Sequence, residues 1–283
     1  MNLFIHWDID PEIFNLFGIP VRYYGILFVG GIVLAIFILE KMAKSQGFTQ
    51  KEWDKLTLYG LLGIVLGARL GHCLFYQPDY FLSHPIEILL PIQQTVDGSY
   101  HFIGYQGLAS HGGGLGLILA LIIFTWQTKR DLWITLDLVA IVTPIAGFFI
   151  RMANLMNSEI IGKPTDMPWG VEFVRSQEWV KQCHSLPCHP TQVYEGLTYL
   201  AIFILNMFLY KRFKSRVGSG FFFGLTITLI FVARFFIEFL KLRQVEFENQ
   251  MSLDMGQWLS IPFVLVGVYF VWRSLNNPPK SGR

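Results

Sequence analysis

The sequence is poor in charged residues and in cysteine. Asp, Glu, Lys and Arg make up only 15% of the 283 residues, whereas a soluble globular domain carries about a quarter. This deficit excludes an ordinary soluble domain, and the hydrophobic fraction of 53% excludes an intrinsically disordered chain. Three cysteines are too few for the disulfide framework of a small secreted protein. The composition therefore predicts an integral membrane protein.

Two further features are absent. The net charge is only +2 and the basic residues form no dense patch, so nucleic acid is not expected as a partner. Residues 1–8 lack a basic stretch followed by an apolar run, so we expect no cleavable signal peptide. The long apolar runs further along the chain are therefore interpreted as membrane spans.

Seven apolar runs approach or exceed the length that can cross a hydrocarbon core, which needs roughly 20 residues in a helix. They predict an all-α membrane protein with seven transmembrane helices, in a single integral membrane domain over residues 1–283. The expected spans are residues 22–39, 56–76, 111–127, 131–151, 193–210, 219–239 and 255–273.

The distribution of lysine and arginine predicts the orientation. Of the 22 basic residues, thirteen lie in the loops and tail on one side and six on the other, while Arg69, Arg151 and Arg234 lie within spans. The six are Arg22, Lys163, Arg175, Lys181, Lys241 and Arg243. Cytoplasmic loops carry the excess of basic residues. We therefore expect the N-terminus in the periplasm and the C-terminus in the cytoplasm.

Polar groups gather near one end of the predicted spans. In this orientation, six helices place such groups near the periplasmic face. One alternative is a transporter, but a transporter would more often place such groups near the midplane, on broken helices related by a repeat. Another alternative is a purely structural membrane partner, which would tolerate alanine at both Arg151 and Arg234. The groups are Arg22, Tyr23, Tyr24, Arg69, His72, His111, Arg151, Asn154, Tyr194, Glu195, Arg234 and Glu238.

Two long segments lie on the predicted outer side. Residues 77–110 contain three prolines and form a predicted periplasmic arm, with a turn expected at Asp97-Gly98. Residues 155–192 contain four prolines and are predicted to form a small, irregular or short-stranded periplasmic cap between spans four and five. Loops this long are usually lids or binding segments. The second span also carries small residues that predict close helix packing: Gly60, Gly63, Gly67 and Gly71.

Residues 150–162 change abruptly from apolar to polar. They include Arg151, Asn154, Asn157 and Glu159. An arginine at mid-membrane costs about 2.5 to 3.5 kcal/mol on insertion scales, so its charge must be offset. One interpretation is that Arg151 extends to the lipid headgroups. The polar neighbours three, six and eight residues further on favour a functional cluster instead.

His111 begins the third span in the run Ser-His-Gly-Gly-Gly. Free backbone N–H groups and the helix dipole at such a position suit a phosphate, although the lysine of a nucleotide-binding loop is absent. A surface position is the simpler interpretation of His111, but beside two intramembrane arginines it becomes a candidate general base. Arg234 and Glu238, four residues apart, fit an internal ion pair. An arginine oriented by a carboxylate also suits bidentate binding of a phosphodiester.

The Cys183-His184 and Cys188-His189 pairs contain metal-ligand residue types at the wrong spacing. Four residues separate the cysteines and no second pair is present, so no metal is expected. A disulfide in an oxidising compartment is the favoured alternative, and two unlinked thiols are the other. Cys73 is assigned to core packing.

Taken together, the motifs resemble those of the prolipoprotein diacylglyceryl transferase family over nearly the whole chain. The most specific segment is Arg151-x-x-Asn154-x-x-Asn157-x-Glu159-x-x-Gly162. The other matching segments are Arg22-Tyr23-Tyr24-Gly25, Gly67-Ala68-Arg69, His111-Gly112-Gly113, His189-Pro190-Thr191-Gln192-Val193-Tyr194-Glu195, Arg234-x-x-x-Glu238, and Met251-Ser252 through Gly256-Gln257 to Ser260-Ile261-Pro262.

The resemblance implies an enzyme of the bacterial inner membrane with its active site toward the periplasmic leaflet. Such an enzyme moves the diacylglyceryl group of phosphatidylglycerol to the lipobox cysteine thiol in the signal peptide of a preprolipoprotein. The reaction forms a thioether, releases glycerol phosphate and begins lipoprotein maturation. Its partners are these two substrates and membrane lipids, and it needs no cofactor.

The resemblance also implies a set of functional residues. We expect the two arginines to bind the phosphate and His111 to act as base or proton carrier. Glu159 and Glu238 are expected to orient the arginines. The headgroup site would be shaped by Tyr24, Asn154 and Gly162. The functional core implied by the family is His111, Arg151, Asn154, Gly162, Arg234 and Glu238.

Overall fold

The computed structural model describes residues 4–16, 19–75, 77–90, 92–95, 98–102, 107, 109–243 and 251–276. Seven of its helices are long and apolar enough to cross a membrane, which confirms the predicted number of spans. These helices are α1 (Tyr23–Ser45), α2 (Gln50–Phe75), α5 (Ser110–Thr128), α6 (Leu132–Met156), α8 (Thr191–Arg212), α9 (Phe221–Glu238) and α10 (Met255–Asn276).

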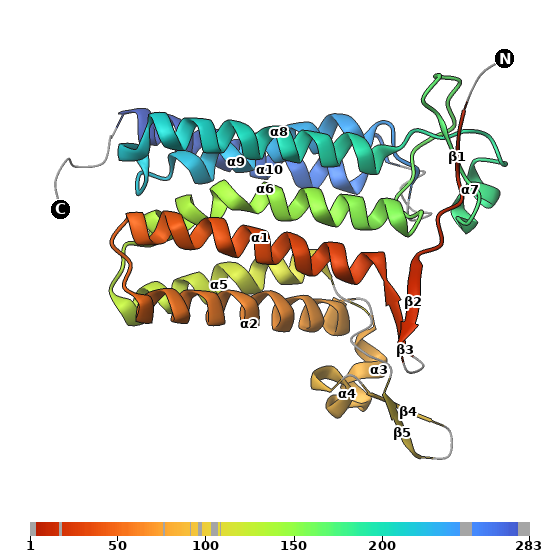
Figure 1. Ribbon diagram of the computed structural model, residues 1–283, viewed down its shortest axis with the longest axis horizontal. Helices are drawn as coiled ribbons and strands as arrows, with labels where there is room; N and C mark the ends of the chain where they lie inside the picture. Colours follow the sequence, from red (N-terminus) through yellow and green to blue (C-terminus); the bar gives the residue numbers. More distant parts are fainter. Residues whose placement is uncertain are drawn as a thin grey trace. The chain divides into compact units, whose positions relative to one another are not determined.

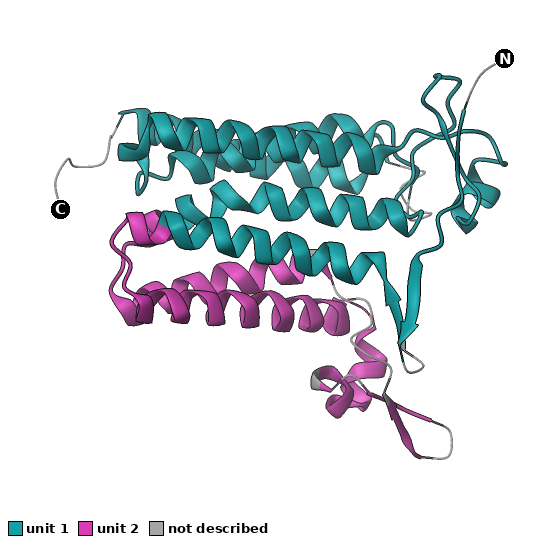
Figure 2. Ribbon diagram, viewed as in Figure 1, with its two compact units in different colours: residues 1–42, 136–283 teal, residues 43–135 magenta. Residues whose placement is uncertain are grey.

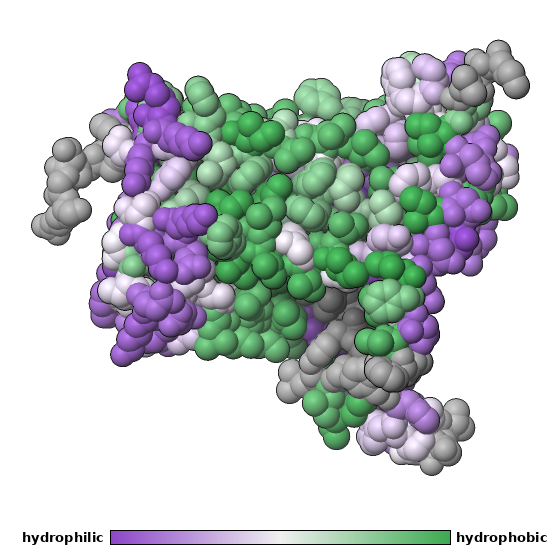
Figure 3. All heavy atoms as spheres, in the orientation of Figure 1, coloured by the Kyte–Doolittle hydropathy of each residue, from purple (hydrophilic) through white to green (hydrophobic). Residues whose placement is uncertain are grey.

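The long helices carry apolar side chains on their outer surfaces. Figure 3 shows hydrophobic residues along the helices and hydrophilic residues where many of the helices end. Phe37 of α1, Phe208 of α8 and Trp272 of α10 are each more than half exposed. Large exposed apolar side chains of this kind fit contact with lipid rather than water.

The junction of α1 and α2 is shorter than the sequence suggested. We expected a loop over residues 40–55, but only four residues separate Ser45 from Gln50. Gly47 ends α1 at φ 75°, with the bonds from Gly47 N–H to Lys44 and from Phe48 N–H to Ala43 that define a Schellman motif. Thr49 and Glu52 then bond reciprocally as a capping box at the start of α2.

The described chain divides into two compact units, and the expectation of a single domain stays a prediction (Figure 2). Residues 43–135 form unit 2, in which α2 and α5 pack through glycines. A Cβ on Gly63 would lie 2.6 Å from the carbonyl oxygen of Gly116, and one on Gly71 would lie 2.8 Å from Cα of Gly112. Only glycine permits this approach, so the predicted close packing is confirmed.

The arm of unit 2 has regular structure that the sequence did not indicate. It consists of α3 (Pro78–Ser83), α4 (Pro85–Leu89), β4 (Ile92–Gln94) and the antiparallel partner strand β5 (Tyr100–Phe102). The expected turn is described at Gly98, whose φ is 84°, while Asp97 lies outside the described residues.

Arg69, one of the three arginines predicted within spans, fixes this arm to α2. Its side chain is buried and donates to the carbonyl oxygens of Ile88 at 3.1 Å and Glu87 at 2.5 Å. The guanidinium also lies 4.8 Å from the ring centre of Phe81. A cation at the C-terminal carbonyls of α4 is favourable, so the structure gives Arg69 a structural role.

Unit 1, residues 1–42 and 136–283, contains α1, α6, α8, α9 and α10 (Figures 1 and 2). Glycines again permit close contacts between helices. A Cβ on Gly31 of α1 would meet Phe149 of α6 at 2.5 Å, and a Cβ on Gly224 of α9 would meet the backbone of Gly267 in α10 at 2.6 Å. The short 3-10 helix η1 (Lys214–Arg216) joins α8 to α9.

The segment predicted to form a cap between spans four and five, residues 155–192, contains short regular elements. Its elements are β6 (Val171–Phe173) and α7 (Gln177–Gln182). The cap also includes β1 (Ile5–Trp7), which pairs parallel with β6 and which the sequence did not reveal. The position of the cap on the periplasmic side stays a prediction. Between β1 and α1, the strands β2 (Glu12–Leu16) and β3 (Ile19–Arg22) form an antiparallel hairpin.

Candidate functional site

The C-terminal end of α6 gives the site its shape. Ser158 has a left-handed φ of 53°, and its N–H bonds to the Leu155 carbonyl at 3.0 Å. The N–H of Glu159 reaches back to the Asn154 carbonyl at 3.1 Å. These two bonds make a Schellman motif, which turns the chain so that Glu159 lies over the last turn of the helix.

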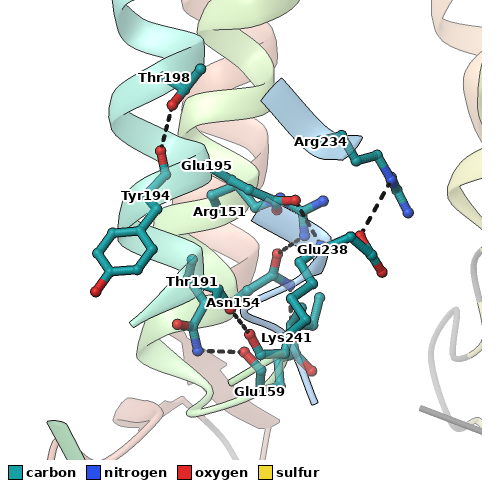
Figure 4. Close-up of polar contacts among 12 residues, drawn as sticks. Arg151, Asn154, Glu159, Thr191, Tyr194, Glu195, Thr198, Arg234, Glu238 and Lys241 are labelled. Atoms are coloured by element: carbon teal, nitrogen blue, oxygen red, sulfur yellow. Dashed lines mark hydrogen bonds and ion pairs between the residues drawn. The ribbon is translucent and has the colours of Figure 1, made fainter. Parts of the chain in front are cut away.

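Asn154 lies between Arg151 and Glu159. Nη1 of Arg151 donates to Oδ1 of Asn154 at 3.1 Å, and Nδ2 of Asn154 donates to Oε1 of Glu159 at 2.7 Å (Figure 4). Glu159 therefore contacts Asn154, which in turn contacts Arg151. The expectation that Glu159 orients an arginine stays a prediction, and Asn154 is the residue through which it would act.

The start of α8 holds this turn in place. Oγ1 of Thr191 donates to the Ile160 carbonyl at 2.8 Å, and Nε2 of Gln192 donates to the Glu159 carbonyl at 2.7 Å. Both side chains are fully buried. Thr191 and Gln192, at the start of α8, thus fix the backbone turn that follows α6.

Arg151 does not extend to the lipid headgroups. Only 13% of its side chain is exposed, and its Nε lies 2.5 Å from Oε2 of Glu195 in α8. Glu195 is fully buried, so this carboxylate neutralises the arginine within the protein. From its place in the sequence, Glu195 is expected near the outer face, but no pattern assigns it to the site.

Lys241 was counted among the basic residues of an outer loop, but the structure buries it. Its Nζ lies 2.7 Å from Oε1 of Glu195 and 3.2 Å from Oε2 of Glu238, with 5% of the side chain exposed. Figure 4 shows three side chains converging: Glu195 from α8, Glu238 from α9 and Lys241 from the segment after α9. One lysine therefore bridges two carboxylates.

Arg234 has the loosest contact of the set. Its Nε lies 3.9 Å from Oε2 of Glu238, and 27% of its side chain is exposed. An internal ion pair is therefore present but long, and Lys241 is the closer partner of Glu238. Of the three cations in this cluster, Arg234 therefore has the longest ion-pair contact and the most exposed side chain.

Tyr24 and α7 border the same region. The hydroxyl of Tyr24 is close enough to Glu159 and Arg151 to interact electrostatically with both. Burial raises the pKa of the Glu178 carboxyl in α7, and the negative charge of Glu159 raises it further. The predicted headgroup residues Tyr24 and Asn154 thus lie beside the same carboxylate.

Gly162 is a point where three backbone segments meet. A Cβ there would lie 2.7 Å from the carbonyl oxygens of both His189 and Leu240. The N–H of Gly162 bonds to His189 at 2.9 Å, and the N–H of the next residue, Lys163, bonds to Leu240 at 2.7 Å. The glycine therefore lets the segment that carries Lys241 approach the end of α6.

His111 belongs to unit 2, where it begins α5 with an exposed side chain. The other predicted site residues, Tyr24, Arg151, Asn154, Glu159, Gly162, Arg234 and Glu238, all belong to unit 1. The approach of His111 to the arginines stays a prediction.

The loop cysteines are joined in a disulfide, Cys183–Cys188, and both are buried in the core of the cap. Nδ1 of His189 is bound to the Tyr194 hydroxyl at 3.1 Å. Within the described ranges, no group of three or more His, Cys, Asp or Glu side chains could hold a metal ion. Cys73 is free and buried, as core packing requires.

We predict that metal removal and loss of the disulfide leave activity largely intact. Strong chelators should not lower turnover, because the cluster uses only arginine, lysine and carboxylate groups. Cys183→Ser with Cys188→Ser should keep most turnover and lose at most about 2 to 4 kcal/mol of unfolding free energy. Turnover and thermal unfolding of the purified variant measure both effects. Inactivation by a chelator that zinc reverses would contradict this assignment.

Comparison with known proteins supports the resemblance over nearly the whole chain. Residues 11–273 match the family model for prolipoprotein diacylglyceryl transferase. The chain belongs to this family. A Bacteroides fragilis protein named phosphatidylglycerol–prolipoprotein diacylglyceryl transferase is 49% identical over 270 residues, which cover 95% of each chain. Proteins of the same name from Porphyromonas gingivalis and Chloroherpeton thalassium are 44% and 36% identical, and each match covers 97% of this chain and 96% of the relative.

This member of the prolipoprotein diacylglyceryl transferase family is thus a multi-pass membrane protein whose unit 1 carries a buried charge cluster. Two residues of the cluster, Glu195 and Lys241, were not predicted as site residues from the sequence. Glu195 could have been found as an acidic residue inside an apolar span, and Lys241 by its spacing of three from Glu238.

Proposed function

We propose that this protein transfers the diacylglyceryl group of phosphatidylglycerol to the lipobox cysteine of preprolipoproteins, the first step of lipoprotein maturation. The observation that carries the proposal is the buried cluster in unit 1. It sets three cations, Arg151, Arg234 and Lys241, against two carboxylates, Glu195 and Glu238. The guanidinium N–H donors of Arg151 and Arg234 suit the phosphate that the reaction displaces.

The reaction requires one new bond and one broken bond. The sulfur of the cysteine thiol bonds to the glyceryl carbon that carries the phosphate, and the C–O bond to the phosphate breaks. The electron pair of that bond goes to the phosphate oxygen, and glycerol phosphate leaves. The thiol proton must go to a base, because only the thiolate is a good nucleophile.

The residues of the cluster divide these tasks. The N–H donors of Arg234 and Arg151 bind the phosphate and stabilise the negative charge that develops on it. Asn154, fixed by Glu159, directs Arg151, while Tyr24 borders the headgroup. Gly162 holds the surrounding backbone segments together. His111, at the start of α5, is the proposed base that takes the thiol proton.

We also propose that the protein lies in the bacterial inner membrane, with its N-terminus and active site on the periplasmic side. Two observations support this orientation. The excess of basic residues lies in the segments assigned to the cytoplasm. The Cys183–Cys188 disulfide of the cap fits the oxidising periplasm.

The orientation can be tested with topology reporters. A reporter fused after Arg283 should be active only as a cytoplasmic fusion, and one inserted near Gln177 in α7 should be active only as a periplasmic fusion. Paired enzymatic reporters, each functional in one compartment, provide the measurement. The reverse pattern would place the charge cluster in the cytoplasmic leaflet and contradict the proposed role in export.

The function itself is tested by following the headgroup. The purified protein is incubated with vesicles of phosphatidylglycerol and a lipobox peptide, and released glycerol phosphate is measured. Release should require the peptide thiol, so a peptide with serine in place of cysteine should release none, and vesicles of phosphatidylethanolamine should also be inert. Release that continues without any thiol would identify a lipid hydrolase instead.

A further inference from the structure

Lys241 is the most deeply placed cation of the cluster. Only 5% of its side chain is exposed, compared with 13% for Arg151 and 27% for Arg234. Its ammonium lies within 3.2 Å of both Glu195 and Glu238. A buried lysine in such contact is neutralised by both carboxylates at once.

The backbone holds Lys241 in this position from two sides. The N–H of Lys241 bonds to the Glu238 carbonyl at 3.1 Å, and the N–H of Leu242 bonds to the Ile161 carbonyl at 3.2 Å. An isolated β-bridge joins Lys241 to Gly162. The lysine is thus tied both to the end of α9 and to the turn after α6.

Each carboxylate bound by Lys241 also contacts an arginine. Glu195 contacts Arg151, and Glu238 contacts Arg234. Without the lysine, two carboxylates would face two arginines, and each arginine would be the only strong partner of a buried negative charge. The guanidinium donors would then be drawn to the carboxylates.

We propose that Lys241 is a positioning residue for phosphate binding. Its ammonium partly satisfies Glu195 and Glu238, which leaves N–H donors of Arg151 and Arg234 available to the lipid phosphate. Lys241 is also one of three cations, with Arg151 and Arg234, that offset the carboxylates of Glu195, Glu238 and the nearby Glu159. This inference rests on the proposed function, because it names how the same site keeps its affinity for an anion.

The proposal is tested by binding as well as by turnover. The probe is labelled glycerol phosphate, whose dissociation constant is measured by equilibrium dialysis against the purified full chain. Lys241→Met should weaken this binding by about 10-fold or more, which corresponds to about 1.4 kcal/mol, and should raise KM for phosphatidylglycerol in parallel. Lys241→Arg keeps the charge and the donors, so its binding should stay within about threefold.

Lys163→Met is the matched control. Lys163 lies on the same backbone junction, but its Nζ bonds to the Phe239 carbonyl at 2.8 Å and its side chain is exposed. Its loss should leave the dissociation constant unchanged. If Lys241→Met fails to fold, Lys241→Gln is measured instead, because its amide keeps hydrogen-bond donors toward the carboxylates but carries no charge. Lys241→Gln should also weaken binding of glycerol phosphate by about 10-fold.

Two results would overturn the proposal. One is folded Lys241→Met that binds glycerol phosphate as tightly as the unaltered chain, which would make the lysine merely structural. The other is Lys241→Arg that folds but binds glycerol phosphate more than about 10-fold more weakly. Failure of the unaltered chain to lipidate a peptide would instead contradict the proposed function, and the dialysis measurement is independent of that outcome.

Discussion

Replacement of Arg234 by lysine should lower diacylglyceryl transfer by about 10²- to 10³-fold, the usual effect of losing one donor that stabilises charge in a transition state. The protein should still fold, because the positive charge is kept near Glu238. A lysine provides a point charge and cannot reproduce the planar, bidentate fork of the guanidinium. Arg151→Lys should have an effect of the same size. Initial rates at matched amounts of membrane protein measure both.

A double variant separates phosphate binding from simple neutralisation of a carboxylate. If Arg234 only balances Glu238, Arg234→Met with Glu238→Met should restore an active enzyme, because apolar replacement of a buried pair is often neutral or stabilising. Since the two side chains are 3.9 Å apart and Lys241 is closer to Glu238, we expect the variant to fold and stay inactive. Near-normal transfer would remove Arg234 from the catalytic set.

Replacement of Glu195 by glutamine should destabilise unit 1 by about 3 to 5 kcal/mol, the cost of leaving one member of a buried ion pair without its partner. The carboxylate is fully buried and lies 2.5 Å from Arg151 and 2.7 Å from Lys241. Its loss leaves two buried cations without their shared counter-charge. Thermal unfolding in detergent should show a fall in the midpoint of roughly 10 °C.

Glu172→Gln is the control for this variant. Glu172 pairs with His6 at 3.2 Å, and 33% of the Glu172 side chain and 64% of the His6 side chain are exposed. An exposed pair contributes at most about 1 kcal/mol, so the midpoint should hardly move. If Glu195→Gln unfolds at the temperature of the unaltered chain, Glu195 does not neutralise Arg151 and Lys241 in the way the structure indicates.

The sequence predicted the features that arise from local patterns. Apolar runs of sufficient length identified all seven long helices, and glycines spaced along α2 indicated the close packing with α5. The polar stretch after Arg151 marked the end of α6 as the site. In each case the signal lies within one element, where hydropathy and spacing are directly visible.

The contacts that complete the site could not be predicted, because they join residues far apart in the chain. Arg151 contacts Glu195, which lies in another helix, and Lys241 appeared to be an ordinary basic loop residue. Sequence periodicity says which face a residue occupies but not which helix it meets. The contacts of Arg69 could not be predicted either. Its partners are backbone carbonyl oxygens of the arm, and these have no signature in the pattern of side chains.

The central claim is that this protein attaches a complete diacylglyceryl group to a cysteine thiol. The most direct measurement is the intact mass of a lipobox peptide after incubation with the purified protein and phosphatidylglycerol of defined acyl chains. We predict a gain equal to the diacylglyceryl group on the cysteine, and this gain should survive hydroxylamine at neutral pH because the bond to sulfur is a thioether. No gain, or the gain of a single acyl group that neutral hydroxylamine removes, would contradict the account.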